Sequence, residues 1–327
     1  MKVIRSYLLR TTRVTKLPLA MQFYLIGLIY RNSRMSCLCL SELVQVAHDR
    51  LYRVLYLAFP YSRRLWEFIA TNLVKADGYL LIDDTTWQRF GKKMAGVSFV
   101  WDSTLSKRVF GMQIVLLIWT DGRWRVPLGL RIWQKGGKSK LKLAQEMVCE
   151  ARRRGITPMY VLFDSWYGGA ELLNLLDSFG WQYITKAKKN RLLDKVRLDK
   201  IFRHRFGRAT GNLKKIQHKC LIVKDGKKYY LTNNQSLPSA EVKRIYRLRQ
   251  QIEEVFRLLK QEFGWGRCRA GSIQSQKAHL HLGLYAFCLT QNKAIEQNQT
   301  IYAFKQDLFR RQIPTQLQFV QHFTAIA

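Results

Sequence analysis

The pattern of apolar residues in the middle of the chain constrains the fold more than any other feature. Four segments rich in β-branched and aromatic residues, separated by glycine and aspartate turns, predict strands at 78–83, 97–101, 111–119 and 125–133. The periodicity then changes and predicts a helix at 141–154, a strand at 159–163, a helix at 170–178 and a strand at 181–185. Antiparallel strands followed by alternating helices and strands predict a mixed α/β sheet with helices packed against it.

Other parts of the chain flank or interrupt this core. A basic, β-rich stretch contains the Asp225-Gly226 turn between two strand-like pieces, which predicts a hairpin and an insertion into the core. The expected parts are a helical region at 1–75, core at 76–190, the insertion at 191–240, core at 241–295 and a helical tail at 296–327.

The helical region offers a candidate DNA-binding element. Helices at 40–47 and 49–57 have the proportions of a helix-turn-helix, with Arg50 and Arg53 on the second helix placed to face DNA. Two helices that only pack against each other give the same pattern. The sequence leaves both interpretations open.

The charge of the chain indicates a polyanionic partner. Its 327 residues include 56 Lys and Arg against 22 Asp and Glu, a net charge of +34. Binding a polyanion such as DNA offsets this self-repulsion. A membrane surface is the alternative, but the longest apolar runs, 17–30 and 110–119, are shorter than the roughly 20 residues that span a bilayer. We therefore expect DNA as the partner, and no membrane.

The cysteines indicate neither a zinc site nor a disulfide framework, because the six are scattered without C-x-x-C spacing. The basic stretch 1–16 is not followed by the apolar segment and cleavage site of a secretory signal. The expected location is the cytoplasm, in association with the nucleoid.

Two aspartates follow apolar strands of the core. Asp84 ends the first strand and Asp164 ends a later one. Polar residues at such positions usually only begin a loop. If the two strands are neighbours, however, both carboxylates emerge at one edge of the sheet, and a helix packed there adds Glu253. Three convergent carboxylates favour a hard divalent cation, and two Mg²⁺ ions support phosphodiester chemistry.

The segment that carries Glu253 predicts a single helix over 244–260. Tyr246, Arg249, Glu253 and Lys260 are spaced by three, four and seven residues, which places them on one helical face. A stripe of apolar residues repeats the same spacing and supplies the face that packs on the core. An ordinary ladder of ion pairs between Glu253 and its cationic neighbours is the alternative interpretation.

These residues carry a resemblance to a known family. The element order resembles the ribonuclease H-like fold, and the spaced residues match the signature Tyr-x2-Arg-x3-Glu-x6-Lys of one group of DDE transposases of prokaryotic insertion sequences. The Asp-Asp-Thr segment at 83–85 and the Phe-Asp-Ser-Trp-Tyr segment at 163–167 are also typical of this group. The resemblance covers about 78–289.

The resemblance implies metal-dependent catalysis. It makes Asp84, Asp164 and Glu253 the catalytic residues and metal ligands, for two Mg²⁺ ions with Mn²⁺ as a substitute. The neighbouring Asp83 and Glu254 are alternatives that the sequence does not exclude.

It also implies residues that contact DNA. Arg249 and Lys260 hold backbone phosphates near the cut, and Tyr246 contacts a phosphate or stacks on a displaced base, unless it is a packed core tyrosine. A basic run after the strand beside the active edge either follows DNA phosphates or is a solvated face. The run consists of Lys186, Lys188, Lys189 and Arg191.

The implied activity is transposition. The protein is expected to cut double-stranded DNA at terminal inverted repeats and to join the ends to target DNA, as a homodimer in the synaptic complex. A metal-dependent nuclease of the same fold and a catalytically inactive DNA-binding relative are the alternatives. Relatives place a tryptophan of the insertion against a flipped base, but no tryptophan lies between Trp181 and Trp265. The candidate substitutes are Tyr229, Tyr230 and Phe202.

Overall fold

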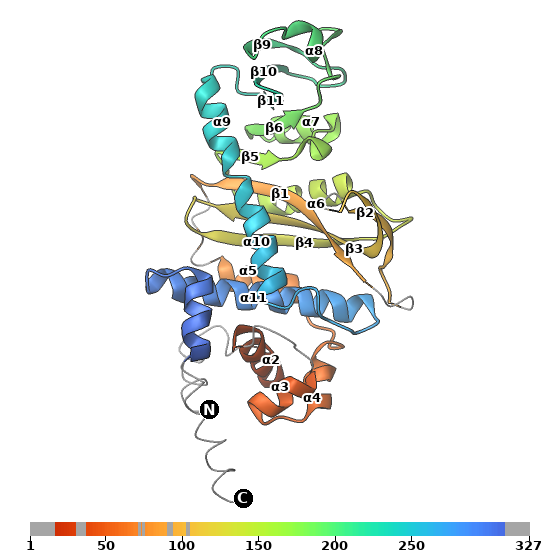
Figure 1. Cartoon of the computed structure of the whole chain (residues 1–327), viewed down its shortest axis with the longest axis vertical. Coiled ribbons are helices and arrows are strands. Elements are labelled where there is room, and N and C mark those ends of the chain that lie inside the picture. The colour runs from red at the N-terminus through yellow and green to blue at the C-terminus, as the bar shows by residue number, and fades with distance from the viewer. Residues whose placement is uncertain are drawn as a thin grey trace, which may run out of the picture. The chain divides into compact units, whose positions relative to one another are not determined.

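The chain forms two compact units (Figure 1). The sheet unit comprises 72–90 and 96–255, and the helical unit comprises 1–71, 91–95 and 256–327. The computed structural model describes residues 17–30, 37–70, 73, 76–89, 94–102 and 105–310.

A mixed sheet organises the sheet unit. Its first strands are β1 (Tyr79–Gln88), β2 (Ser98–Asp102), β3 (Lys107–Thr120), β4 (Arg125–Trp133), β5 (Tyr160–Phe163) and β6 (Tyr183–Ala187). β1 lies between β3, to which it is antiparallel, and β5, to which it is parallel. β6 is parallel to β5. These pairings confirm the predicted mixed α/β sheet.

The strands of the expected insertion continue the same sheet (Figure 1). They are β9 (Phe206–Asn212), β10 (Lys219–Asp225) and β11 (Lys228–Thr232). β11 pairs with β6, and β10 and β11 form the predicted hairpin, with Gly226 at a φ of 60° in its turn. A short hairpin of β7 (Leu192–Leu193) and β8 (Val196–Arg197) and the helix α8 (Leu198–Ile201) precede them.

Helices cover the sheet and connect its strands. α6 (Lys140–Arg153) begins at Ser139, whose hydroxyl accepts a hydrogen bond from the backbone N–H of Lys142 at 3.1 Å. It ends before Gly155, which has a φ of 77°. α6 packs on β3 and β4. The 3₁₀ turn η2 (Ser165–Tyr167) and helix α7 (Ala170–Ser178) connect β5 to β6.

β1 is longer than the sequence analysis predicted. It continues through Thr85, Thr86 and Trp87 to Gln88, paired with β3 along its whole length. The prediction that Asp84 ends this strand is therefore wrong. The physical reason is that the residues after Asp84 are β-branched and aromatic, and they pack as a strand even though two aspartates precede them.

The predicted single helix over 244–260 is divided in two. α9 (Ser239–Arg247) ends and α10 (Gln250–Gln261) begins around a turn at Leu248 and Arg249. The backbone N–H of Arg249 donates to the carbonyl of Tyr246, three residues back, at 3.1 Å, and Ile252 donates likewise to Arg249 at 3.2 Å. Neither proline nor glycine causes this tightened turn. We attribute it to tertiary contacts of Tyr246 and Arg249, which are described below.

The helical unit contains α2 (Leu19–Tyr30), α3 (Cys37–Val44), α4 (His48–Val54), α5 (Tyr61–Ile69), α11 (Ile273–Glu296) and a helix at 301–310. α2 and α5 pack on α11. Gln45, with a φ of 55°, lies in the connection between α3 and α4. The DNA-reading role of this helix pair stays a prediction. In the described part of the chain, no helix combines the length and the apolar character needed to cross a bilayer.

His279 is a structural residue of the helical unit. Its Nε2 lies 2.9 Å from the carbonyl of Gly264, and its Nδ1 lies 2.8 Å from the hydroxyl of Tyr24. A carbonyl only accepts, so Nε2 carries the proton, and Nδ1 accepts from the tyrosine. Both ring nitrogens of this buried histidine therefore have hydrogen-bond partners within the helical unit.

Lys305 makes the stability of the helical unit depend on pH. Burial lowers the pKa of Lys305 to about 8, although Glu262 at 3.6 Å favours the charged form. Below this pKa the cost of burying the charge is present in full, and it falls as pH rises toward the ordinary value of 10.5. We expect the free energy of unfolding to rise from pH 8 to pH 10 more steeply in the natural chain than in Lys305→Met.

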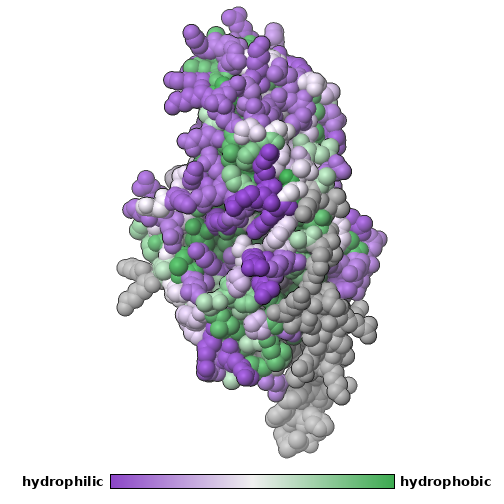
Figure 2. All heavy atoms as spheres, turned by 180° about the vertical axis from the view of Figure 1, so that it is seen from behind, coloured by the Kyte–Doolittle hydropathy of each residue, from purple (hydrophilic) through white to green (hydrophobic). Residues whose placement is uncertain are grey.

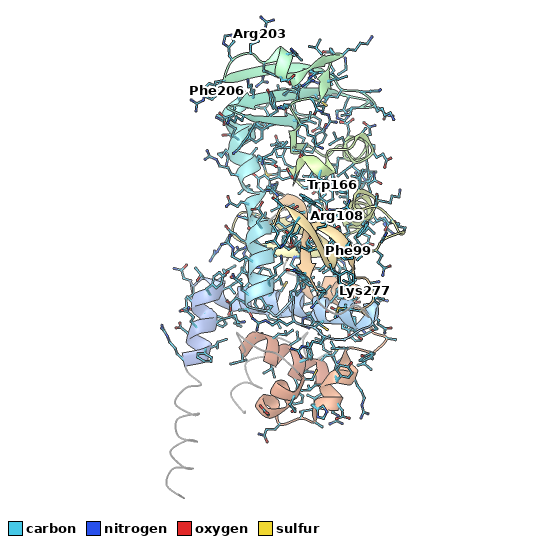
Figure 3. The ribbon with its side chains drawn as sticks, turned by 45° about the vertical axis from the view of Figure 1, so that its right-hand side comes forward. Phe99, Arg108, Trp166, Arg203, Phe206 and Lys277 are labelled. Atoms are coloured by element: carbon cyan, nitrogen blue, oxygen red, sulfur yellow. The ribbon has the colours of Figure 1, made fainter. Side chains whose placement is uncertain are left out.

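Urea titration of the helical unit at several pH values checks this expectation. Lys277, which is exposed on α11 (Figure 3), supplies the matched control Lys277→Met. If the free energy of unfolding depends on pH in the same way for the natural chain and Lys305→Met, the lowered pKa of Lys305 is contradicted.

Candidate active site

The two aspartates of β1 lie on opposite faces of the sheet. Gly129 of β4 faces α6, because a Cβ atom there would lie 3.1 Å from the Sδ of Met147. Gly129 and Ile82 are paired with the same residue of β3, so Ile82 also faces α6. Residues alternate between the faces along a strand. Asp84 therefore lies on the α6 face, and Asp83 lies on the other.

Asp164 lies level with Asp83. In the parallel pairing of β1 with β5, Ile82 is opposite Phe163, so the next residues of the two strands are Asp83 and Asp164. Asp164 keeps an extended backbone, with φ −80° and ψ 163°, before the chain turns into η2. The two strands are neighbours, as predicted, and Asp83 and Asp164 share a face.

Arg249 joins two of the acids on this face. Its Nη1 donates to Oδ2 of Asp83 at 2.8 Å, and its Nη2 donates to Oε1 of Glu253. The side chain of Arg249 is 14% exposed and that of Glu253 is 47% exposed. The ion pair that the sequence analysis weighed for Glu253 is thus present. Glu254 pairs instead with Arg125 of β4, at 3.0 Å.

Asp84 has protein donors on both of its oxygens. The hydroxyl of Tyr167 donates to Oδ1 at 2.9 Å, and Nζ of Lys140 donates to Oδ2 at 2.8 Å. Lys140 Nζ also lies 4.2 Å from the centre of the Trp166 ring, which is 49% exposed (Figure 3). Lys140 and Tyr167 were not predicted from the sequence as partners of Asp84. Tyr167 belongs to the quoted Phe-Asp-Ser-Trp-Tyr segment, whereas Lys140 gave no signal.

The cluster perturbs the ionisation of its members. Burial raises the pKa of Asp83 to about 7 against the effect of the Arg249 guanidinium, and the carboxylates of Asp84 and Asp164 add to the rise. Burial opposes the charge of Arg249, but the neighbouring Asp83, Tyr246 and acids raise its pKa overall. The neighbouring carboxylates thus add to the effect of burial on Asp83, and their attraction for the guanidinium favours the charged form of Arg249. Such a cluster is stabilised by an additional cation.

The sequence of the chain matches a known protein family. Residues 76–289 match the family model of the transposase DDE domain. The chain belongs to this family. A search of curated proteins gives no match.

One solved structure supports the fold of this DDE transposase domain. The chain is similar to piggyBac transposase in a synaptic complex with hairpin DNA, with 10% identity, coverage of 94% of this chain and 77% of that chain, and a TM-score of 0.53. This similarity fits a ribonuclease H-like fold. The NurA nuclease from Sulfolobus solfataricus is 11% identical, with 67% of this chain and 85% of that chain covered, at a TM-score of 0.30. The Mos1 strand transfer complex is 13% identical, with 51% and 59% covered, at a TM-score of 0.21. These two add nothing to the fold assignment.

DDE transposases generally use divalent metal ions, and carboxylate oxygens are suitable ligands for them. Among the described residues, however, no three Asp, Glu, His or Cys side chains are grouped so as to hold an ion. Arg249 engages Asp83 and Glu253, and Lys140 engages Asp84. The site therefore offers the right kind of ligand, but its carboxylates are paired with cations of the protein itself.

Tyr246 and Lys260 differ in their placement. The hydroxyl of Tyr246 donates to the carbonyl of Phe163 at 3.2 Å, directly before Asp164, and burial raises its pKa. Its ring is 6% exposed, so in this structure Tyr246 anchors α9 to β5. Lys260 lies in the last turn of α10, in the part of that helix that belongs to the helical unit.

The basic run after β6 lies in the sheet unit. Lys186 is half-buried with Nζ 5.7 Å from the centre of the Tyr246 ring, and Lys188 and Lys189 are exposed. Arg191 is half-buried and donates from Nη1 to the carbonyl of Gly168 at 2.9 Å. Hydrophilic side chains cover the end of the sheet unit built from β9 to β11 (Figure 2).

The aromatic residues named as substitutes for a base-stacking tryptophan are buried. Tyr229, Tyr230 and Phe202 are each 7% exposed. Phe206 at the start of β9 is 60% exposed and was not singled out from the sequence (Figure 3). It lies in the predicted insertion at 191–240, outside the predicted hairpin, and no sequence signal indicated its exposure.

Proposed function

We propose that the chain is a DNA transposase that cuts transposon ends and joins them to target DNA. The observation that carries the proposal is the placement of Asp83, Asp164 and Glu253 on one face, with Arg249 joining the first and the last. Membership of the transposase DDE family supports metal-dependent strand chemistry at such a cluster. The net charge of +34 supports DNA as the substrate.

The proposed metal ligands are Asp164, Glu253 and one aspartate of β1. The resemblance to DDE transposases implies Asp84 in this role, which stays a prediction, while the face shared with Asp164 favours the alternative, Asp83. When bound, two divalent ions activate the attacking oxygen and stabilise the leaving oxygen. The protein's own contribution is to hold Asp83 and Asp164 level on a rigid sheet, with Arg249 neutralising Asp83 and Glu253.

The proposed DNA contacts extend from this face. Lys186, Lys188, Lys189 and Arg191 follow β6, the strand next to β5, and are proposed to bind backbone phosphates with Lys260. Arg249 is proposed to contact a backbone phosphate through its bidentate guanidinium. Hydrolysis at each inverted repeat frees a 3′ hydroxyl. This hydroxyl attacks a phosphodiester of the target DNA and displaces the 3′ oxygen of the cut target strand. Two copies are proposed to hold two ends.

A joining assay tests this proposal. The purified chain receives DNA with the inverted repeats that flank its gene, together with target DNA, in Mg²⁺ or Mn²⁺. We expect strand-transfer products, identified by sequencing the junctions. Fragments without junctions would instead identify a nuclease, and bound but intact DNA would identify an inactive DNA-binding protein.

A further inference from the structure

A basic pocket lies beside the loop that follows Asp164. Its volume is about 370 Å³, and it lies within the sheet unit. Three segments far apart in the chain build it. They contribute Ser165, Lys188, Asn190, Arg191, Leu192 and Lys214.

The charges around the pocket are of one sign. Lys188, Arg191 and Lys214 line it, and no acidic residue is among the lining residues. Within the described part of the chain, none of these three cations forms an ion pair. By contrast, Arg249, Lys140 and Arg197 each pair with an acid. Uncompensated positive charge in a concave site attracts an anion.

Arg191 is built into the pocket rather than loosely attached to it. Its Nη1 donates to the carbonyl of Gly168, the one protein acceptor that its guanidinium meets among the described residues. A Cβ atom at Gly168 would lie 3.2 Å from the carbonyl oxygen of Ser165 and 3.4 Å from that nitrogen, so the loop and the guanidinium are closely packed. The guanidinium has five N–H donors, and those left over are available to a ligand. Burial lowers the pKa of Arg191, which is the cost that a bound anion offsets.

The pocket is linked to the candidate active site through the chain. Ser165 directly follows Asp164, and the bond from Arg191 to Gly168 ties the same loop to the segment after β6. We propose that this pocket binds one phosphodiester of the DNA strand and thereby sets the position of that strand relative to Asp164. The inference rests on the proposed function. Lys214, Asn190 and Ser165 are assigned here to DNA contact.

Matched variants test the pocket. Lys188→Gln with Lys214→Gln removes two charges from it, whereas Lys215→Gln with Lys219→Gln removes two exposed charges from the same region outside it. Binding of a labelled short duplex is followed by fluorescence anisotropy over a range of NaCl concentrations. We expect the pocket pair to weaken binding about tenfold and to reduce the salt slope by about 0.9, the value for one phosphate, and the control pair to change affinity less than about threefold.

A second variant guards against misfolding. Asn190→Asp is nearly isosteric and places a negative charge in the pocket, so we expect it to weaken DNA binding while the thermal unfolding midpoint stays unchanged. If the two lysine pairs lose DNA affinity equally, the proposed phosphodiester site is contradicted, and the lysines only contribute to a general attraction for DNA. Binding of inorganic phosphate that is lost in the pocket pair, with DNA affinity unchanged, would identify a free phosphate site and overturn the proposal.

The outcomes separate this inference from the proposed function. If the natural chain cuts and joins DNA, but the pocket pair and the control pair change DNA affinity equally, the phosphodiester pocket is contradicted and the transposase proposal stands. If the natural chain joins no DNA, but the pocket pair weakens DNA binding and the control pair does not, the transposase proposal is contradicted and the phosphodiester pocket stands.

Discussion

Asp164→Asn and Glu253→Gln are expected to lose DNA strand cleavage by roughly three orders of magnitude while binding DNA as tightly as the natural chain. Each change keeps the size of the side chain and removes the charge that a divalent ion requires. Such an ion contributes several kcal/mol of transition-state stabilisation, and about 1.4 kcal/mol corresponds to a tenfold change in rate. Single-turnover cleavage of a labelled transposon end in Mg²⁺ measures the loss, and anisotropy measures binding.

Glu254→Gln is the matched control for this prediction. Glu254 is next to Glu253 but pairs with Arg125 on β4, so its replacement is expected to change the rate less than about threefold. Unchanged cleavage by Glu253→Gln would remove Glu253 from the mechanism. A loss of DNA binding in either catalytic variant would leave the rate comparison without meaning, so binding is measured first.

The adjacent aspartates of β1 offer a sharper comparison within the same prediction. Asp83→Asn is expected to lose cleavage as severely as Asp164→Asn, because both carboxylates lie level on one face. Asp84→Asn is expected to lose about tenfold, since its carboxylate faces α6 and is held by Tyr167 and Lys140. The reverse ranking would support the assignment made from the sequence, and would require Asp84 to exchange these partners for a metal.

The order of elements could be predicted from sequence because it depends on local patterns. The apolar runs of β3 and β5, the Asp225-Gly226 turn and the amphipathic α6 each have a period or a turn signal that does not depend on distant residues. The pairing of β1 with β5 did not follow from these local patterns, and only the resemblance to the ribonuclease H-like fold implied it. The length of β1 was not predicted from the sequence, because two adjacent aspartates resemble the start of a loop. With the strand ended too early, the sequence did not indicate which of the two aspartates shares a face with Asp164.

The details of the site depended on contacts between distant residues. Arg249 and Asp83 are 166 residues apart in the sequence. Their contact coincides with the turn between α9 and α10, although the residues at this turn favour a continuous helix. Lys140 and Asp84 are also distant in the sequence, 56 residues apart. A spacing rule placed Tyr246, Arg249 and Glu253 on one helical face, but the fold divides them around a turn. Tyr246 bonds to the backbone of β5, while Arg249 pairs with Glu253 and also reaches Asp83.

Gly283→Ala is expected to destabilise the helical unit by about 2–4 kcal/mol, although helix propensity alone predicts the opposite. Gly283 lies within α11, where alanine is favoured over glycine by about 1 kcal/mol. A Cβ atom there would lie 2.5 Å from Cδ1 of Trp265, a fully buried ring whose Nε1 donates to the carbonyl of Leu280 at 2.9 Å. Overpacking costs about 1–3 kcal/mol, and losing the buried hydrogen bond adds a similar amount, so the clash outweighs the propensity.

Urea unfolding distinguishes these two effects. Gly271 lies in the same unit with no atom within 4 Å of an added Cβ, so Gly271→Ala is expected to be neutral or slightly stabilising. Trp265→Leu is costly alone, but combined with Gly283→Ala it should cost less than the sum of the two changes, because the smaller side chain vacates the space that the new methyl group needs. If the free energy changes of the two substitutions are strictly additive, the methyl group at position 283 and the Trp265 ring do not compete for the same space. Some feature other than the close packing of α11 against Trp265 would then require glycine at position 283.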